Sequence, residues 1–240
     1  MTRRALVTGG SGAIGTAICR ALARDGAHVA IHAHRHVSEA ARIADEIRTA
    51  GGSAESIAFD VTDAVATGQE LERLLEGGPI QILINNAGIH SDAPMAGMTQ
   101  AQWQSVLAVS LNGFFNVTQP LLLPMMATRW GRIVSLSSVA AVLGNRGQAN
   151  YAAAKSGLHG ATRSLALELA SRGVTVNVVA PGIIATPMSE RAFSPQTIAS
   201  LVPMKRAGTP EEVAALVAFL ASDAAGYISG QLIRIDGAMA

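Results

Sequence analysis

The stretch ALVTGGSGAIG, residues 5–15, predicts how the chain begins to fold. A short apolar strand comes first, a glycine-rich turn follows, and residues 16–24 have a helical pattern. The spacing Gly10-x-Gly12-x-x-Gly15 between a strand and a helix is typical of a dinucleotide-binding turn, in which N–H groups at the helix start bind a pyrophosphate. A plain strand-to-helix loop is the alternative, because a glycine-rich turn alone is a weak signal.

The same alternation of strand and helix continues to the end of the chain. The expected strands are residues 5–7, 28–33, 54–59, 80–84, 131–136, 174–179 and 231–235. The expected helices are residues 16–24, 39–49, 64–76, 99–128, 149–171 and 210–222. This order predicts an α/β protein, a single domain over residues 1–240 built on a Rossmann-type doubly wound parallel sheet of about seven strands with helices on both faces.

The composition favours a globular protein with no overall charge bias, so that any acidic partner must be met by a local patch. Of 240 residues, 49% are hydrophobic but only 4% are aromatic, so aliphatic side chains must fill the core. The formal net charge of +1 argues against nucleic acid or an anionic membrane as a partner. We expect no secretory signal, no membrane span and a cytoplasmic location. The single cysteine, Cys19, is expected to be buried in a helix.

The end of the second strand indicates which dinucleotide the turn binds. An acidic residue there would bind the ribose of NAD, whereas positive charge would accept the 2′-phosphate of NADP. Residues 29–37 contain no acid, and His34 and Arg35 lie at the strand end, which favours NADP(H). His32, His34 and His36 alternate as metal ligands could, but no Cys, Asp or Glu lies close by in sequence, so we expect no metal. The outer histidines could also belong to a solvated loop.

Two further strand ends carry residues suited to a cofactor. Asp60 follows the third strand, at the edge where ligands of parallel sheets gather, and could face an adenine. Its alternative role is to cap the next helix, which Thr62 or Asp63 could equally do. After the fourth strand, the small residues within 85–88 would let the backbone pass close to a cofactor.

Tyr151 and Lys155 form a candidate acid–base pair. They are four residues apart on a predicted helix, so their Cβ atoms lie about 5–6 Å apart on one face, and Ser138 lies just upstream. A tyrosine has a pKa of about 10, and a neighbouring ammonium favours the phenolate. We therefore expect Lys155 to lower the pKa of Tyr151. An ordinary helix face is the alternative, because Tyr-x-x-x-Lys is common.

Residues 182–203 form a polar segment before the last helix. Pro187, Pro195 and Pro203 interrupt it, so we expect a mobile substrate lid at about residues 183–205.

Together, these motifs resemble the short-chain dehydrogenase/reductase family over nearly the whole chain. The motifs that carry the resemblance are Thr8-Gly9-x-x-x-Ala13-x-Gly15, Asn85-Asn86-Ala87-Gly88, Ser138, Tyr151-x-x-x-Lys155, Pro181-Gly182 and Asp236-Gly237. Residues 144–155 and 208–214 further resemble the 3-oxoacyl-[acyl-carrier-protein] reductases. That resemblance implies NADPH-dependent reduction of a 3-oxoacyl thioester on an acyl carrier protein, usually in a homotetramer. Helices 99–128 and 149–171 would form one interface, and the C-terminal segment another.

The resemblance also implies roles for single residues. Tyr151 would donate a proton to the substrate carbonyl, Ser138 would hydrogen-bond the same oxygen, and Lys155 would hold the nicotinamide ribose. The residues implied in cofactor binding are Gly9, Ser11, Gly12, Ile14, Gly15, His34, Arg35, Asp60, Val61, Asn86, Ala87, Gly88, Tyr151, Lys155, Pro181, Gly182, Ile184 and Thr186. Arg129 and Arg172 match positions that receive the acidic carrier protein, or are ordinary helix-end cations.

Two positions depart from the family pattern. Ser110 stands where relatives usually have an asparagine that supports a proton-feeding water, and Asn112 would face about 200° away on an α-helix. Three outcomes are open: a backbone carbonyl does the work and Ser110 suffices, the proton relay is slower, or the chain is a degenerate partner subunit. The intact catalytic residues favour the first. Gly12 replaces the arginine of many NADPH-using relatives, which leaves the 2′-phosphate to Arg35 and its neighbouring histidines.

The leading hypothesis is a 3-oxoacyl thioester reductase in fatty-acid or polyketide- or polyene-type synthesis. A reductase of a free small ketone or alcohol is one alternative. A weakly active or non-catalytic subunit, in a hetero-oligomer with an active paralogue, is the other.

Overall fold

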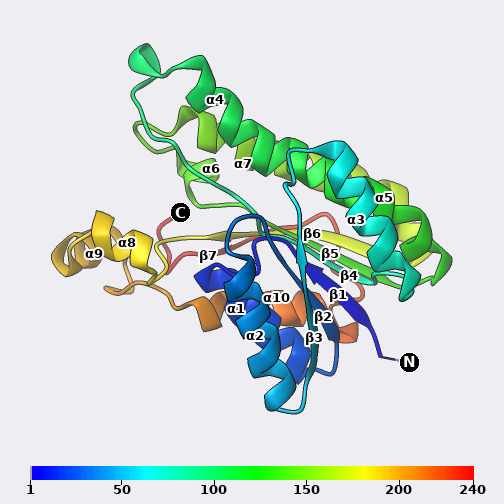
Figure 1. Cartoon of the computed structure of the whole chain (residues 1–240). Helices are drawn as coiled ribbons and strands as arrows, with labels where there is room; N and C mark the ends of the chain where they lie inside the picture. The colour runs from blue at the N-terminus through cyan, green and yellow to red at the C-terminus, as the bar shows by residue number, and fades with distance from the viewer. Residues whose placement is uncertain (1) are drawn as a thin grey trace.

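Seven strands form one sheet in the computed structural model, which describes residues 2–240 apart from the side chains of residues 188, 190 and 191. The strands are β1 (Arg4–Val7), β2 (His28–Ala33), β3 (Ser53–Ala58), β4 (Ile82–Asn85), β5 (Gly131–Leu136), β6 (Val174–Pro181) and β7 (Leu232–Ile235). Their order is β3-β2-β1-β4-β5-β6-β7, and every neighbouring pair is parallel. The predicted doubly wound parallel sheet is confirmed (Figure 1).

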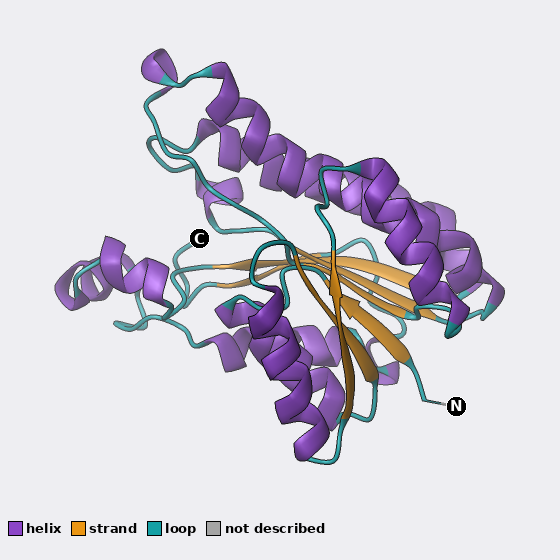
Figure 2. Ribbon diagram, in the orientation of Figure 1, coloured by secondary structure: helices purple, strands orange, loops and turns teal. Residues whose placement is uncertain are grey.

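Helices cover both faces of the sheet (Figure 2). One face carries α1 (Ala13–Arg24), α2 (Val37–Thr49) and α10 (Pro210–Leu220), and the other carries α3 (Ala64–Glu76), α4 (Gln100–Leu107), α5 (Gly113–Ala127) and α7 (Ala149–Leu169). Each face has its own buried cluster, with Ile18 and Val217 in one and Leu121 and Ile133 in the other. Burial of these aliphatic faces supplies the main favourable free energy of folding.

The strand order reverses between β1 and β4. In an open parallel sheet, ligands bind outside the carboxyl ends of the strands at such a reversal. The turns after β1 and β4 meet closely there: a Cβ on Gly9 would lie 3.1 Å from both Cα of Ala87 and Nδ2 of Asn86. Gly9 also has a φ of 62°, a left-handed conformation that favours glycine. The fold therefore brings two of the predicted site segments together.

The predicted helix over residues 99–128 is interrupted in its middle. Thr99 caps α4, and a π-helical turn, η2 (Ala108–Asn112), joins α4 to α5. The N–H of Gly113 donates to the Ala108 oxygen, five residues back, so the Val109 carbonyl loses the partner it would have in an α-helix. Sequence periodicity did not reveal this turn, because the residues on both sides continue a helical pattern.

The helix over Gln100–Ala127 is apolar enough, by length and composition, to cross a membrane, with a mean hydropathy of 1.4. Here it packs on the sheet, and 39% of its most apolar window is buried. A core helix passes the same test, so this property is weak evidence for a membrane span.

The segment between β6 and α10 contains two short helices, α8 (Pro187–Ala192) and α9 (Pro195–Leu201). Thr186 and Ser194 cap them, and each helix begins with a proline. The expectation that Pro187 and Pro195 break regular structure was wrong, because proline fits the first helical position, where no N–H partner is needed. Both helices project beyond the sheet on the carboxyl side (Figure 1).

Several short elements also lie outside the sequence predictions. They are α6 (Ala140–Leu143) and the 3-10 turns η1 (Met95–Gly97), η3 (Ala170–Arg172) and η4 (Asp223–Ala225). Strand β6 extends past its predicted end to Pro181, because its last residues pair with β7. The α6 turn follows Ser138 directly and so belongs to the candidate site.

Candidate active site

Lys155 is buried next to the carboxyl end of β5. Its side chain is 3% exposed, and Nζ donates a 2.8 Å hydrogen bond to the Leu136 oxygen. Burial lowers the pKa of Lys155 to about 8, because the ammonium loses water. A Cβ on Gly88 would lie only 3.0 Å from Nζ, so a larger residue there would crowd the ammonium. The amine is thus held in a narrow site between the turn after β4 and the end of β5.

Tyr151 lies one helical turn before Lys155 on α7, but the two do not form a direct hydrogen bond. Nζ of Lys155 is 5.9 Å from the centre of the Tyr151 ring. Burial raises the pKa of Tyr151, the neighbouring Ser138 hydroxyl lowers it, and the charge of Asp92 raises it. The net direction is upward. The pKa of Tyr151 is therefore raised and not lowered as the spacing to Lys155 predicts, because the loss of water around the phenol dominates.

Ser138 follows β5 and faces the same space as Tyr151. Its Oγ accepts a 3.2 Å hydrogen bond from the N–H of Ala140, in the first turn of α6. Its own hydrogen remains available for an oxygen in the site. The residues expected to carry the chemistry, Ser138, Tyr151 and Lys155, therefore meet at one edge of the sheet.

Ser110 lies within the π-helical turn and points toward the same place. Its Oγ is buried without a hydrogen-bond partner among residues 2–240, and it lies 3.6 Å from the position of a Cβ on Gly88. Lys155 flanks that position from the other side. Asn112 is exposed, so the structure does not bring it to the lysine. An unpaired buried hydroxyl costs free energy unless a ligand or water satisfies it.

The glycine-rich turn leaves the start of α1 open. No side chain caps this helix, and Ser11, Gly12 and Ile14 lie in or beside its first turn. A Cβ on Gly15 would lie 2.3 Å from the Gly9 oxygen, which side chains cannot tolerate. Free N–H groups and the helix dipole at this end suit a pyrophosphate, and the cradle fits the cofactor that the motif predicts.

His32, which the sequence suggested only as a possible metal ligand, holds this turn in place. His32 accepts a 3.1 Å hydrogen bond from the Gly9 N–H on Nδ1 and donates from Nε2 to the Phe59 oxygen at 2.9 Å. Burial lowers its pKa to about 4, so it is neutral at pH 7. Both ring nitrogens are engaged, which leaves none for the metal site considered above. Within residues 2–240, no three potential ligand side chains cluster.

Thr8 and Asn86 join the turn after β1 to the turn after β4. Thr8 Oγ1 accepts hydrogen bonds from the N–H groups of Asn86 and Ala87, each at 3.0 Å. The Asn86 amide donates to the oxygens of Thr8 and Gly9, also at 3.0 Å. Asn86 thus supports the cradle with both of its side-chain hydrogens. A Thr followed by glycine at a strand end was the available signal for Thr8.

The edge beyond β2 and β3 contains the residues predicted to meet the adenosine end. His34 and Arg35 are exposed, and Nε2 of His34 lies 3.7 Å from Oδ2 of Asp60. Asp60 accepts two hydrogen bonds from Thr62, whereas Asp63 caps α3. Asp60 is therefore not the helix cap. The Val61 side chain packs against Gly113 of α5, which leaves only its backbone for a ligand.

The remaining cofactor candidates line the chain between β6 and α8. The Gly182 N–H donates to the Ile235 oxygen, and Gly182 packs on Asp236 so closely that a Cβ would lie 2.7 Å from its Cα. The Pro181 oxygen accepts from the Val139 N–H, and the Ile184 side chain is buried in the core. Thr186 caps α8.

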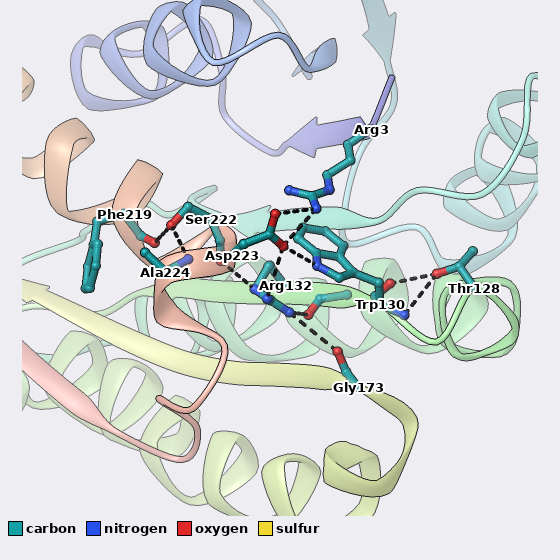
Figure 3. Close-up of polar contacts among 10 residues, drawn as sticks. Arg3, Thr128, Trp130, Arg132, Gly173, Phe219, Ser222, Asp223 and Ala224 are labelled. Atoms are coloured by element: carbon teal, nitrogen blue, oxygen red, sulfur yellow. Dashed lines mark hydrogen bonds and ion pairs between the residues drawn. The ribbon is translucent and has the colours of Figure 1, made fainter. Parts of the chain in front are cut away.

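Arg129 and Arg172 are exposed, and the turns that carry them are adjacent. They lie at the amino ends of β5 and β6, opposite the carboxyl ends where the candidate site lies. They precede β5 and β6, whereas Ser138 follows β5, so a six-residue strand, roughly 20 Å long, separates them from the candidate catalytic residues. The two turns pack tightly, since a Cβ on Gly173 would lie 2.3 Å from the Arg129 oxygen. Next to Arg129, Trp130 is sandwiched between Arg3 and Arg132 (Figure 3).

Comparison with known proteins agrees with this geometry. A family model described as short chain dehydrogenase matches residues 3–197. Nodulation protein G of Azospirillum brasilense is 45% identical, covering 98% of this chain and 97% of that protein. The acetoacetyl-CoA reductase of Allochromatium vinosum is 42% identical and covers 100% and 99%. The 3-oxoacyl-[acyl-carrier-protein] reductase of Escherichia coli is 43% identical and covers 98% and 96%.

A solved structure is also very similar. The crystal structure of a putative gluconate dehydrogenase from Agrobacterium tumefaciens superimposes with a TM-score of 0.95 at 35% sequence identity, covering 99% of this chain and 95% of that one. Two kinds of named substrate, acyl thioesters and a sugar acid, therefore occur among proteins with this fold and comparable identity.

Proposed function

The chain belongs to the short-chain dehydrogenase family, and we propose that it reduces a 3-oxoacyl thioester on an acyl carrier protein to the 3-hydroxyacyl product with NADPH, in fatty-acid or polyketide- or polyene-type synthesis. The observation that carries this proposal is the meeting of Ser138, Tyr151 and Lys155 beside an open glycine cradle. Similarity over nearly the full length to curated acyl-thioester reductases supports the choice of substrate.

Residues of three segments would hold the cofactor. The uncapped start of α1 would bind the pyrophosphate with Gly9, Ser11, Gly12, Ile14 and Gly15, and Arg35 with His34 would accept the 2′-phosphate. The backbone near Asp60 and Val61 would meet the adenine. Further groups would line the nicotinamide end: Asn86, Ala87, Gly88, Pro181, Gly182, Ile184 and Thr186. When bound, the dihydronicotinamide supplies the hydride that reaches the carbonyl carbon.

Tyr151 would donate the proton to the carbonyl oxygen. Its raised pKa keeps the phenol protonated at neutral pH, which suits the reducing direction, while Ser138 donates a hydrogen bond to the same oxygen as negative charge develops. Lys155, mostly protonated below its pKa of about 8, would hold the ribose and return a proton toward Tyr151. The Ser110 hydroxyl and the released Val109 carbonyl would hold the water that feeds Lys155.

Assembly would bring the carrier protein within reach of a catalytic site. Arg129 and Arg172 lie at the edge opposite Tyr151, so a carrier bound there would serve the site of a neighbouring copy. Phe115 and Leu123 on α5 and Leu167 on α7 are exposed, which supports burial of this helical face between subunits. We propose a homotetramer, with α8 and α9 acting as the substrate lid over residues 183–205.

The test measures NADPH oxidation by purified protein with acetoacetyl-CoA and with the same acyl group on a carrier protein. Tyr151→Phe should lower kcat by roughly 10³-fold on both substrates, since positioned acids contribute about 10²–10⁴-fold. The double variant Arg129→Glu/Arg172→Glu should lower kcat/KM about tenfold for the carrier substrate and leave acetoacetyl-CoA unchanged. An equal loss on both substrates would refute docking. Absence of any turnover would favour the non-catalytic subunit.

A second candidate is an oxidoreductase that reduces a free small ketone or oxidises the corresponding alcohol. The similarity to a solved structure titled as a putative gluconate dehydrogenase favours testing it. A sugar-acid substrate turned over faster than either thioester would replace the leading proposal.

A further inference from the structure

A histidine and a serine outside the catalytic trio flank the Lys155 backbone. Ser137 lies between Leu136, whose oxygen accepts from Lys155, and Ser138. The Oγ of Ser137 is 3.2 Å from the Lys155 backbone oxygen and 2.7 Å from Nε2 of His159, one helical turn further along α7. Ser137 is buried and His159 is half-buried. The end of β5 is therefore tied to α7 through both the side chain and the main chain of Lys155.

The single hydrogen of the Ser137 hydroxyl decides how these contacts are made. If Ser137 donates to the Lys155 oxygen, then Nε2 of His159 must carry a hydrogen and donate to Oγ. If Nε2 accepts instead, Ser137 turns its hydrogen toward His159 and the bond to Lys155 is lost. The tautomer of His159 thus controls whether β5 holds Lys155 at two points or at one.

We propose that His159 is a positioning residue for the reduction, which directs the Ser137 hydroxyl onto the Lys155 main chain and so sets the spacing of Lys155 and Ser138. This inference rests on the proposed function. It assigns His159 no contact with substrate or cofactor. Positioning to within a fraction of an ångström matters, because a displacement of about 1 Å at a site can cost roughly 10²-fold in rate.

The charges around His159 favour its neutral form at pH 7. Burial and the charge of Arg163, on the same helix, both lower its pKa. The elements packed against α7 are α4, the π-helical turn, α6, η3, β5 and β6. The charged residues in these elements are Arg132, whose side chain bonds to backbone oxygens at the amino end of β5, and Arg172 at the far end of α7. The hydrogen-bond partners, not protonation, therefore select the tautomer.

The test compares substitutions at both members of the pair. His159→Leu should lower kcat about tenfold with KM for NADPH within about twofold, and Ser137→Ala should do the same. The double variant should be no worse than Ser137→Ala alone, because that variant already removes both contacts. His159→Gln, whose amide can donate to Ser137, should restore kcat to within about threefold. Arg163→Gln, on the same helix, is the control and should leave kcat at pH 7 unchanged.

Two results would overturn the proposal. The first is an additive double variant, or a lower melting temperature without a change in kcat, either of which would give the pair a purely structural role. The second is independent of turnover: nitrogen-15 NMR of labelled His159 should find the hydrogen on Nε2, and a hydrogen on Nδ1 would contradict the hydrogen-bond direction. A protein that reduces no thioester refutes the proposed function, while the NMR result still decides the tautomer.

Discussion

Polar groups at the amino ends of the strands, here called the amino edge, are paired with one another, whereas several at the carboxyl ends, the carboxyl edge, are not. At the amino edge, Asp223 accepts two hydrogen bonds from Arg3 and one from Nε1 of Trp130, all at 2.8 Å. The Trp130 ring lies between the guanidinium groups of Arg3 and Arg132, 3.7 and 4.2 Å from its centre (Figure 3). Arg132 also donates to backbone oxygens of Ser222 and Gly131. These groups satisfy one another's hydrogen bonds and charges, and in this sense the amino edge is closed.

At the carboxyl edge, some polar groups lack hydrogen-bond partners within the described chain, and one charged group is buried at a cost in free energy. Ser110 Oγ is buried without a partner, the start of α1 has no side-chain cap, and the Lys155 ammonium is buried enough to lower its pKa. Such features reduce stability, but they supply binding groups where a ligand can complete them. The fold therefore gains stability from the Trp130 cluster at the amino edge and keeps the candidate catalytic groups at the carboxyl edge.

Apart from Tyr151→Phe, the largest expected effect is at Arg35, on the open carboxyl edge. Arg35 is exposed beyond β2 and has no salt bridge in the described residues. Arg35→Asp should lower the ratio of kcat/KM for NADPH over NADH about 10²-fold, because a charge-assisted contact is replaced by repulsion. Arg24→Asp, another exposed arginine, is the matched control. An unchanged cofactor ratio in Arg35→Asp would refute the 2′-phosphate role.

The Trp130 cluster at the amino edge should respond in stability alone. Trp130→Ala removes a stacked ring and a hydrogen bond, so the free energy of unfolding should fall by about 2 kcal/mol, roughly a 30-fold change in the folding equilibrium. Trp130→Phe keeps the ring and should lose about half as much. Denaturant unfolding measures both. A fall in kcat per folded molecule for Trp130→Ala would show that the Trp130 cluster also contributes to turnover.

Lys155 should make activity and stability respond to pH in opposite directions. Deprotonation above pH about 8 should lower kcat/KM for reduction about tenfold per pH unit. The folded-state pKa lies below the ordinary value of 10.5, so between those two values the unfolded chain binds more protons, and this group's contribution to stability rises with pH. Rate profiles and denaturation at matched pH values test this. A profile that declines only above pH 10 would contradict it.

The smallest expected effect is at Ser110. Ser110→Ala removes the unpaired hydroxyl, but the Val109 carbonyl released by the π-helical turn remains, so kcat should fall only about threefold. Stability should rise slightly, because an unsatisfied buried group is lost. A loss as large as that of Tyr151→Phe would show that the hydroxyl itself is the proton relay.

Much of the fold followed from short-range pattern. Most of the parallel strands are largely apolar, although β3 contains Ser53, Glu55 and Ser56, and glycine or proline marks most strand ends, so the seven strands of the α/β sheet were predictable to within one or two residues. The π-helical turn was not, since no residue in Ala108–Asn112 interrupts helical periodicity. The capped helices α8 and α9 were missed for a different reason: proline was taken as a breaker, although Thr186 and Ser194 supplied start signals.

The sequence by itself determined which chemistry the chain carries, because glycine at tight turns and Tyr151 four residues before Lys155 depend on local geometry. Tertiary structure decided the environment of those groups. It half-buried Tyr151 and removed water from the phenol, so that its pKa rises where spacing alone predicts a fall, and it joined Ser137 to His159 from separate elements. Burial and long-range hydrogen bonds depend on which elements pack together, and residue spacing along one helix does not contain that information.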